Sequence, residues 1–179
     1  GGWQALLTRY VVVEGGGKLP FDTRVDYGQV FVDEDQFSEG PARRLDAVRG
    51  QLLAVSPSQM SREERLAWAI NTYNFLVFDR ISRNVVVKGK KQLWRYGDVR
   101  EVNSGAGAFY DTPVVQVDGR SYSLTEFQRR FVYGDSTPVY EPRTAPGDPR
   151  LRYALSHGTL GGPPLLPRVY RPDSLEAQL

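Results

Sequence analysis

The sequence predicts a single α+β domain in which several helices surround a central buried helix and pack on a small, mainly antiparallel sheet. Residues 61–83 read as one long helix that is apolar on almost every side, as is typical of a helix at the centre of a domain. Asp118 and Gly119, flanked by residues that favour strands, indicate a β-hairpin over 114–124. With 179 residues and 40% hydrophobic side chains, the chain can form one sizeable core but hardly two full-sized domains. We therefore expect residues 1–179 to form one domain.

Composition excludes several classes of function. The formal charge is only +2, so the domain as a whole lacks the excess of basic residues that is typical of nucleic-acid binding. The absence of cysteine excludes disulfides, thiolate nucleophiles and Cys-ligated metals. No apolar run is long enough to cross a membrane. The chain begins without Met, so we suspect a processed, exported protein, periplasmic or extracellular, with a cytoplasmic location as the alternative.

The first half of the chain predicts a helix, an extended segment and a second helix. Trp3, Leu6, Leu7 and Tyr10 have helical spacing before a run of glycines. Residues 20–31 read as extended or turn-like, and the acidic run 33–35 reads as a solvated turn rather than a Ca²⁺ loop. An amphipathic helix over 41–55, with Pro41 in its first turn, comes next.

The central helix begins with a capping box and contains two amides. Ser61 and Glu64 form the S-x-x-E pattern that starts a helix. Asn71 and Asn74 are i,i+3 neighbours on one side of that helix, so they need specific hydrogen-bond partners if buried. We favour a role in fastening the helix to a neighbouring loop over one in orienting a substrate.

The second half predicts short strands and helices. A strand over 85–88, the hairpin, and a helix over 124–132 that is capped by Ser123 and Glu126 follow in order. After a Pro-rich surface loop, residues 150–157 read as a helix started by Asp148 and Pro149 and ended by Gly158, with a buried strand as the alternative. The "GGPP" segment indicates a rigid turn rather than a phosphate cradle.

Several spaced motifs together resemble one family. They are "VDY" at 25–27, "LAWAINTYN" at 66–74, "YSL" at 122–124, "DPRLRYAL" at 148–155, "PPL" at 163–165 and the terminal "SLEAQL". Together they make the chain similar to the DUF547 family, a group of domains of unknown function.

The resemblance also implies that reactive positions have changed. Family members commonly carry His, Cys and a second Cys where this chain has Arg152, His157 (near the first Cys position) and Gly162. In the helix after the hairpin, Gln128 and Arg129 stand in place of an acid and a histidine. If the family's polar cluster is catalytic, this chain has lost most of it.

The candidate site is a pocket that these positions would share. Its residues are His157, Asn71, Asn74, Gln128 and Arg152. An imidazole can act as a general base near neutral pH, and a serine such as Ser104 or Ser121 would have to supply the missing nucleophile. We predict no cofactor and no metal site, because one histidine without cysteine is a poor ligand set for zinc.

Three functions remain open at this point. The leading hypothesis is a DUF547-like domain that is not catalytic and serves as a binding or assembly module, with another protein as partner. The first alternative is a hydrolase or acyl transferase that uses a repurposed Ser–His or carboxylate site. The second is binding of an anionic ligand through the basic loop 88–100; nucleic acid is the less favoured ligand, and the candidate residues are Lys88, Lys90, Lys91, Trp94 and Arg95.

Overall fold

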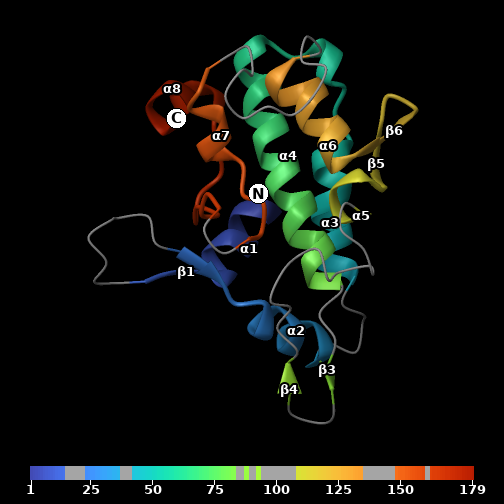
Figure 1. Cartoon of the computed structure of the whole chain (residues 1–179), viewed down its shortest axis with the longest axis vertical. Coiled ribbons are helices and arrows are strands. Elements are labelled where there is room, and N and C mark those ends of the chain that lie inside the picture. Colours follow the sequence, from blue (N-terminus) through green and yellow to red (C-terminus); the bar gives the residue numbers. More distant parts are fainter. Residues whose placement is uncertain are drawn as a thin grey trace.

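The fold is organised around one long helix. The computed structural model describes residues 1–14, 23–36, 42–83, 87–88, 92–93, 108–134, 148–159 and 162–179. Helix α4 (Arg62–Arg83) runs through the middle of the molecule, and the other elements pack around it (Figure 1). The predicted α+β class is confirmed, and the described strands form three separate two-stranded antiparallel pairs.

Helix α4 is buried on nearly every side, as its sequence predicts. Its start is fixed by the predicted capping box, in which the Ser61 N–H donates to Glu64 Oε2 at 2.9 Å and the Glu64 N–H donates to Ser61 Oγ at 3.2 Å. Its middle turns carry fully buried side chains, including Ile70, Tyr73 and Phe75. The helix therefore separates two hydrophobic clusters and belongs to both.

The first cluster joins α4 to the N-terminal elements. These are α1 (Gly2–Tyr10), β1 (Val11–Val13), β2 (Thr23–Val25), α2 (Tyr27–Gln36) and α3 (Ala42–Leu53). The short helix η1 (Pro57–Gln59) lies between α3 and α4 and is not part of the cluster. The ring of Trp3 lies 5.4 Å from the rings of both Phe75 and Phe78, measured between centroids. Leu165, from the far end of the chain, is also buried in this cluster.

The second cluster joins α4 to the C-terminal elements. These are α5 (Ala108–Asp111), β5 (Pro113–Val117), β6 (Arg120–Ser123), α6 (Leu124–Phe127), the π-helix η3 (Gln128–Tyr133), α7 (Leu151–Ala154) and α8 (Leu175–Gln178). The short helix η4 (Pro172–Ser174) precedes α8 and has no buried residue. The remaining pair, β3 (Val87–Lys88) and β4 (Gln92–Leu93), is antiparallel. The predicted hairpin is confirmed, and Asp118 and Gly119 both have positive φ, as its two-residue turn requires.

Sequence predictions of secondary structure were wrong in part of two segments. The segment 20–31 was expected to be extended or turn-like, which holds for β2 (Thr23–Val25), but α2 begins at Tyr27 because the Asp26 carboxylate accepts the Gln29 N–H at 2.9 Å and caps a helix. The helix expected over 150–157 ends at Ala154. Gly158 does adopt positive φ, but four residues beyond the helix end.

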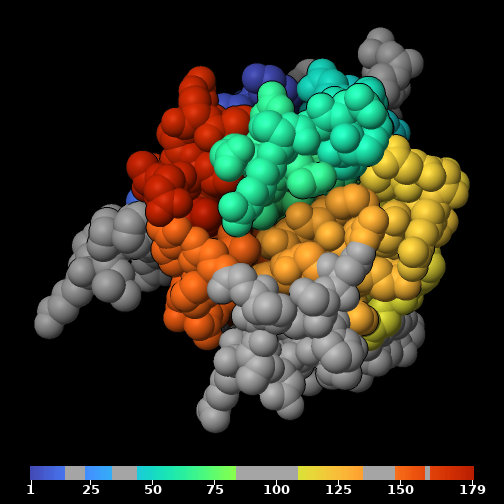
Figure 2. All heavy atoms as spheres, turned by 90° about the horizontal axis from the view of Figure 1, so that it is seen from above, coloured from blue at the N-terminus to red at the C-terminus, as the bar shows by residue number. Residues whose placement is uncertain are grey.

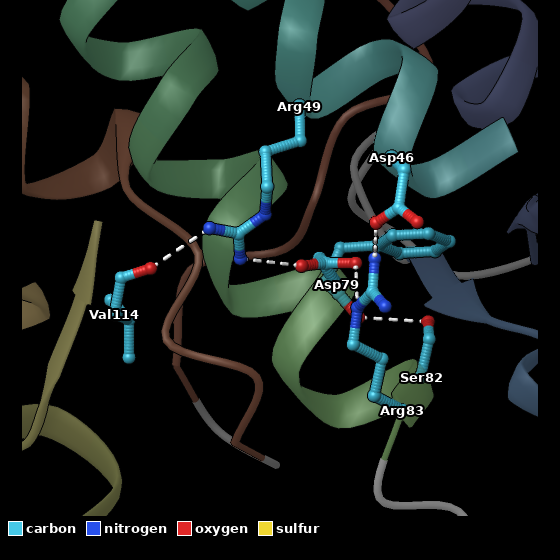
Figure 3. Close-up of polar contacts among 7 residues, drawn as sticks. Asp46, Arg49, Asp79, Ser82, Arg83 and Val114 are labelled. Atoms are coloured by element: carbon cyan, nitrogen blue, oxygen red, sulfur yellow. Dashed lines mark hydrogen bonds and ion pairs between the residues drawn. The ribbon is translucent and has the colours of Figure 1, made fainter. Parts of the chain in front are cut away.

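A buried ion cluster ties α3 to α4 (Figure 3). Asp79 on α4 is fully buried and accepts from Arg49 Nη2 and Arg83 Nε, each at 2.7 Å. Arg49 also donates to the Val114 carbonyl at 2.9 Å, and Arg83 pairs with the exposed Asp46. Each Asp79 oxygen accepts from a cationic donor, so the charge of the buried carboxylate is balanced. The cluster thereby holds α3, α4 and β5 together.

Candidate functional site

The two asparagines of α4 hold the C-terminal segments by their backbone. Asn74 Nδ2 donates to the Ala154 carbonyl at 2.9 Å, and its Oδ1 accepts the Ser156 N–H at 2.8 Å. One turn earlier, Asn71 makes the same two-point contact with Tyr170, at 2.7 and 2.9 Å. The Ala154 carbonyl is thus turned to Asn74 rather than to a helical partner, which explains why α7 ends there and Leu155 is extended (φ −99°, ψ 113°).

His157 follows this clamp and lies half-buried among aromatic rings. Its ring centroid is 5.8 Å from that of Tyr73 and 6.3 Å from that of Tyr110. The Tyr110 hydroxyl donates to the His157 carbonyl at 2.6 Å. Burial disfavours the imidazolium, so the pKa of His157 is lowered from its ordinary value near 6.5 and the ring is neutral at pH 7.

The imidazole has one backbone partner and one nitrogen left over. His157 Nδ1 lies 3.1 Å from the Leu155 carbonyl oxygen, which can only accept. The neutral ring therefore carries its proton on Nδ1, and Nε2 keeps a lone pair. Among the described residues, no hydroxyl hydrogen-bonds to this ring. Ser121 is exposed on β6, and Ser104 lies outside the described residues.

The other two candidate residues lie in different surroundings. Gln128 is buried at the start of η3, where its Oε1 has no hydrogen-bond partner in the part of the chain that the structure describes. Arg152 is exposed; its Nε donates to the Pro149 carbonyl at 3.0 Å and its guanidinium lies over the ring of Tyr153. Asn74 and His157 therefore both contact the backbone of residues 154–156, whereas Arg152 lies on the surface.

A surface hollow of about 140 Å³ lies elsewhere on the molecule, beside the hairpin. Arg120 and Tyr122 of β6, Glu126 of α6 and Arg129 and Arg130 of η3 line it. Of these residues, only Arg129 was named from the sequence, as a changed position, and the other four were not predicted to belong to a site. The signal that could have found the hollow is the alternation of Arg120 and Tyr122 on one strand face, followed by the arginine pair on the next helix.

The comparison with protein families bears on all of these positions. The model of "Protein of unknown function, DUF547" matches residues 57–179. The chain belongs to the DUF547 family. No curated protein and no solved structure matches it.

Membership in DUF547 covers α4 and every element after it. The clamp asparagines, Gln128, Arg152, His157 and the "PPL" residues all lie within the matched range. The "VDY" motif at 25–27, which also suggested the resemblance, lies before that range, as do α1, α2 and α3. The DUF547 match in this chain thus begins just ahead of its central helix, and the N-terminal cluster packs onto that helix from outside the match.

Two further predicted sites have different outcomes in this DUF547 member. Of the basic loop 88–100, Lys88 is described only as part of β3, and Lys90, Lys91, Trp94 and Arg95 lie outside the described residues. The acidic run 33–35 was expected to be a solvated turn, and this is wrong, because it belongs to α2 and Asp33 is buried.

The burial of Asp33 has a clear cause. Its carboxylate accepts from Arg9 Nε at 2.5 Å, from the Tyr10 hydroxyl at 2.9 Å and from Gln29 Nε2 at 2.7 Å. These bonds, led by that from Arg9, hold the pKa of Asp33 well below its usual range. Asp33 thus joins α1 to α2.

Within the described ranges, no group of three or more His, Asp or Glu side chains is arranged to hold a metal ion. No helix there is long and apolar enough to cross a membrane.

Proposed function

We propose that this DUF547 domain is not catalytic and acts as a binding module for another protein. The observation that carries the proposal is the bonding of Asn74 and His157. The groups that would be expected to handle a substrate are engaged with the backbone of residues 154–156. Catalysis by His157 would also need a nucleophile in hydrogen-bond reach, and none of the described residues supplies one.

The changed positions support the same proposal. The resemblance implies a reactive cluster at positions where this chain has Gln128, Arg152 and His157, and Arg152 is exposed and turned to its own helix. The clamp by Asn71 and Asn74 persists because it fastens the C-terminal segments to α4, a task that needs no chemistry. A domain that keeps its framework without a reactive cluster is suited to recognition.

A hydrolase or acyl transferase is the second candidate, and one observation favours it. His157 is neutral at pH 7 and has a lone pair on Nε2, so it could accept a proton from an incoming hydroxyl. The hydroxyl would have to come from a serine; Ser121 is exposed on the hairpin, and Ser104, the other serine named from the sequence, lies outside the described residues.

Turnover measurements separate the two candidates. We expect the purified chain to show no hydrolysis above background on a panel of ester and amide substrates, and His157→Ala to behave identically. Thr159→Ala, two residues away and exposed, is the matched control. Turnover that is present in the wild type and in Thr159→Ala but lost in His157→Ala would overturn the proposal.

The binding role needs a measurement of its own. The chain, immobilised through either terminus, should retain a specific protein from lysate of its source organism in a defined stoichiometry after washing at moderate salt. Light scattering on the purified complex should then give the summed mass of the two chains. A chain that remains alone in both experiments would contradict a binding module.

We also propose that residues 1–179 form one domain. The support is the sharing of α4 between the two hydrophobic clusters, with Phe75 and Phe78 turned to the N-terminal elements. The C-terminal segment also returns to those elements, since the Thr23 hydroxyl donates to the Leu165 carbonyl at 2.8 Å and Gln4 bonds to Pro167 and Val169.

A further inference from the structure

The hollow beside the hairpin gathers positive charge at one place on the surface. Among the residues that the structure describes, its lining contains three arginines and one glutamate. The hairpin that contributes Arg120 and Tyr122 adjoins the α6–η3 segment that contributes the other three residues (Figures 1 and 2). Side chains from two consecutive elements thus face one small space.

The hairpin presents Arg120 in a fixed position. Arg120 directly follows the Asp118–Gly119 turn and pairs with Val117, so Arg120 and Tyr122 lie on the same strand face. The Arg120 guanidinium lies 5.0 Å from the centroid of the Tyr122 ring. A guanidinium that stacks on a ring keeps its N–H donors in the plane and available for an oxygen ligand. In the described part of the chain, Arg120 makes no ion pair.

The Tyr122 ring on which Arg120 stacks belongs to the hydrophobic core. Tyr122 is only 7% exposed, and its ring meets that of Phe131 edge to face at 5.3 Å. Phe131 in turn packs edge to face on Trp68 of α4, with ring centroids 5.3 Å apart, and its ring is tilted against that of Phe127 at 4.8 Å. The stacked arginine therefore rests on a packed aromatic cluster.

The helical wall of the hollow is held by a capping box. The Ser123 N–H donates to Glu126 Oε2 at 2.8 Å, and the Glu126 N–H donates to Ser123 Oγ at 3.2 Å. Glu126 is thereby bound to the helix start. The chain then continues as the π-helix η3, which carries Arg129 and Arg130. Single-turn π-helices are found often at functional sites, since they change where successive side chains point.

The chemistry of the hollow selects an anion with several oxygens. One carboxylate offers two oxygens, whereas a phosphoryl group offers three and carries nearly two negative charges. Three guanidinium groups therefore suit a phosphoryl group better. At about 140 Å³, the hollow is smaller than the range of roughly 300–1,000 Å³ that encloses a whole small molecule. It accommodates one group that projects from a larger surface.

We propose that this arginine hollow binds the phosphoryl group of a phosphorylated side chain on a partner protein. The choice of a protein as the partner rests on the function proposed above, while the choice of a phosphoryl group rests on the lining residues alone. The hollow would serve as the charged anchor of the interface, a mode in which clustered arginines recognise phosphorylated side chains.

The test uses the full chain and a minimal probe. Phosphoserine capped at both ends by acetyl and methylamide groups is titrated while the Nε–Hε signals of the arginines are followed by NMR. We expect the signals of Arg120, Arg129 and Arg130 to shift with the probe, and capped serine to leave them unchanged. Added NaCl should weaken the binding, because these partly exposed charges are screened by salt.

Three variants make the test specific. Arg120→Gln removes one charged donor and should weaken phosphoserine binding by about tenfold. Glu126→Gln removes the carboxylate charge and keeps an oxygen for the Ser123 N–H, so binding should strengthen by about threefold. Arg65→Gln, an exposed arginine on α4, is the matched control and should change nothing.

The outcomes that would overturn the inference are distinct. Equal binding of capped glutamate and capped phosphoserine would remove the phosphoryl preference. Tighter binding of inorganic phosphate than of capped phosphoserine would assign the hollow to a free phosphate and remove the protein partner. Shifts that survive Arg120→Gln unchanged would place the anion elsewhere. None of these results bears on catalysis, which the His157→Ala turnover experiment tests separately.

Discussion

The side-chain oxygen of Asn74 on α4 accepts the backbone N–H of Ser156, and both groups are buried at a distance of 2.8 Å. The same amide donates to the Ala154 carbonyl at 2.9 Å, so it satisfies two backbone groups on either side of Leu155. Since Leu155 is itself fully buried, this amide fixes where the segment enters the core.

Asn74→Ala should therefore destabilise the chain by about 2–4 kcal/mol, because two buried backbone groups lose their partners. Urea denaturation followed by circular dichroism measures the change. Asn71→Ala is the matched comparison: its bonds to Tyr170 are only partly buried, so water can replace them and the loss should be smaller. Equal losses in the two variants would contradict the importance of burial.

The Asp79 cluster gives a second prediction. Asp79→Asn should cost about 3 kcal/mol, because the buried carboxylate is the shared partner of Arg49 and Arg83. Asp46→Asn removes a carboxylate from the same Arg83, but the Asp46 side chain is 55% exposed, so the cost should stay below about 1 kcal/mol. Thermal unfolding of the two variants side by side would reveal the difference, and similar melting temperatures would show that the buried ion cluster does not stabilise the fold.

Local patterns in the sequence predict much of this fold. The capping boxes at Ser61 and Ser123 and the turn at Asp118–Gly119 lie where predicted, because each depends on residues within a few positions. The start of α2 was missed although its signal was present, since Asp26 and Gln29 have the spacing of a capped first turn.

Other features depend on residues that are far apart in the chain. Periodicity extends α7 to residue 157, but Asn74 captures the Ala154 carbonyl and ends the helix earlier. The acidic run near Asp33 reads as solvated until Arg9 and Tyr10 are brought to it by packing of α1 on α2. The position of Arg152 depends on packing in the same way: the sequence groups it with His157, but in the structure its side chain is exposed and its Nε donates to the Pro149 carbonyl.

The packing of Trp3 gives a third prediction, which tests the single-domain proposal. Trp3→Ala should destabilise the chain by about 3–5 kcal/mol, because the indole is buried against Phe75 and Phe78. Tyr153→Ala, at a side chain that is 67% exposed, should change stability by less than about 0.5 kcal/mol. Calorimetry should show one transition in each variant.

If residues 1–179 form one domain, the part that the family match covers should not fold by itself. A chain of residues 57–179 leaves out α1, α2 and α3, so it would expose the face of α4 that carries Phe75 and Phe78. We expect it to bind hydrophobic dyes and to lack a cooperative transition. A cooperative transition at the melting temperature of the full chain would contradict a single domain.

His157 gives a prediction about pH. It is the only histidine, and burial lowers its pKa in the folded chain below the value near 6.5 that it has when unfolded. As pH falls below about 6.5, the unfolded chain therefore binds more protons than the folded one, and the free energy of unfolding decreases until the folded-state pKa is passed. The pKa values of carboxylates such as Asp33 and Asp148 are lowered in the folded chain. Their protonation therefore decreases the free energy of unfolding at more acidic pH than that of His157.

Denaturation at pH 7.5 and pH 5.5 measures this effect. The wild type should be less stable at pH 5.5. His157→Asn retains a donor for the Leu155 carbonyl and does not titrate, so its stability should change much less between the two pH values. Titration of the His157 ring protons by NMR gives the folded-state pKa independently. A pKa at or above 6.5, together with equal pH dependence in the variant, would mean that the imidazole is solvated, and this would restore His157 as an accessible group for chemistry.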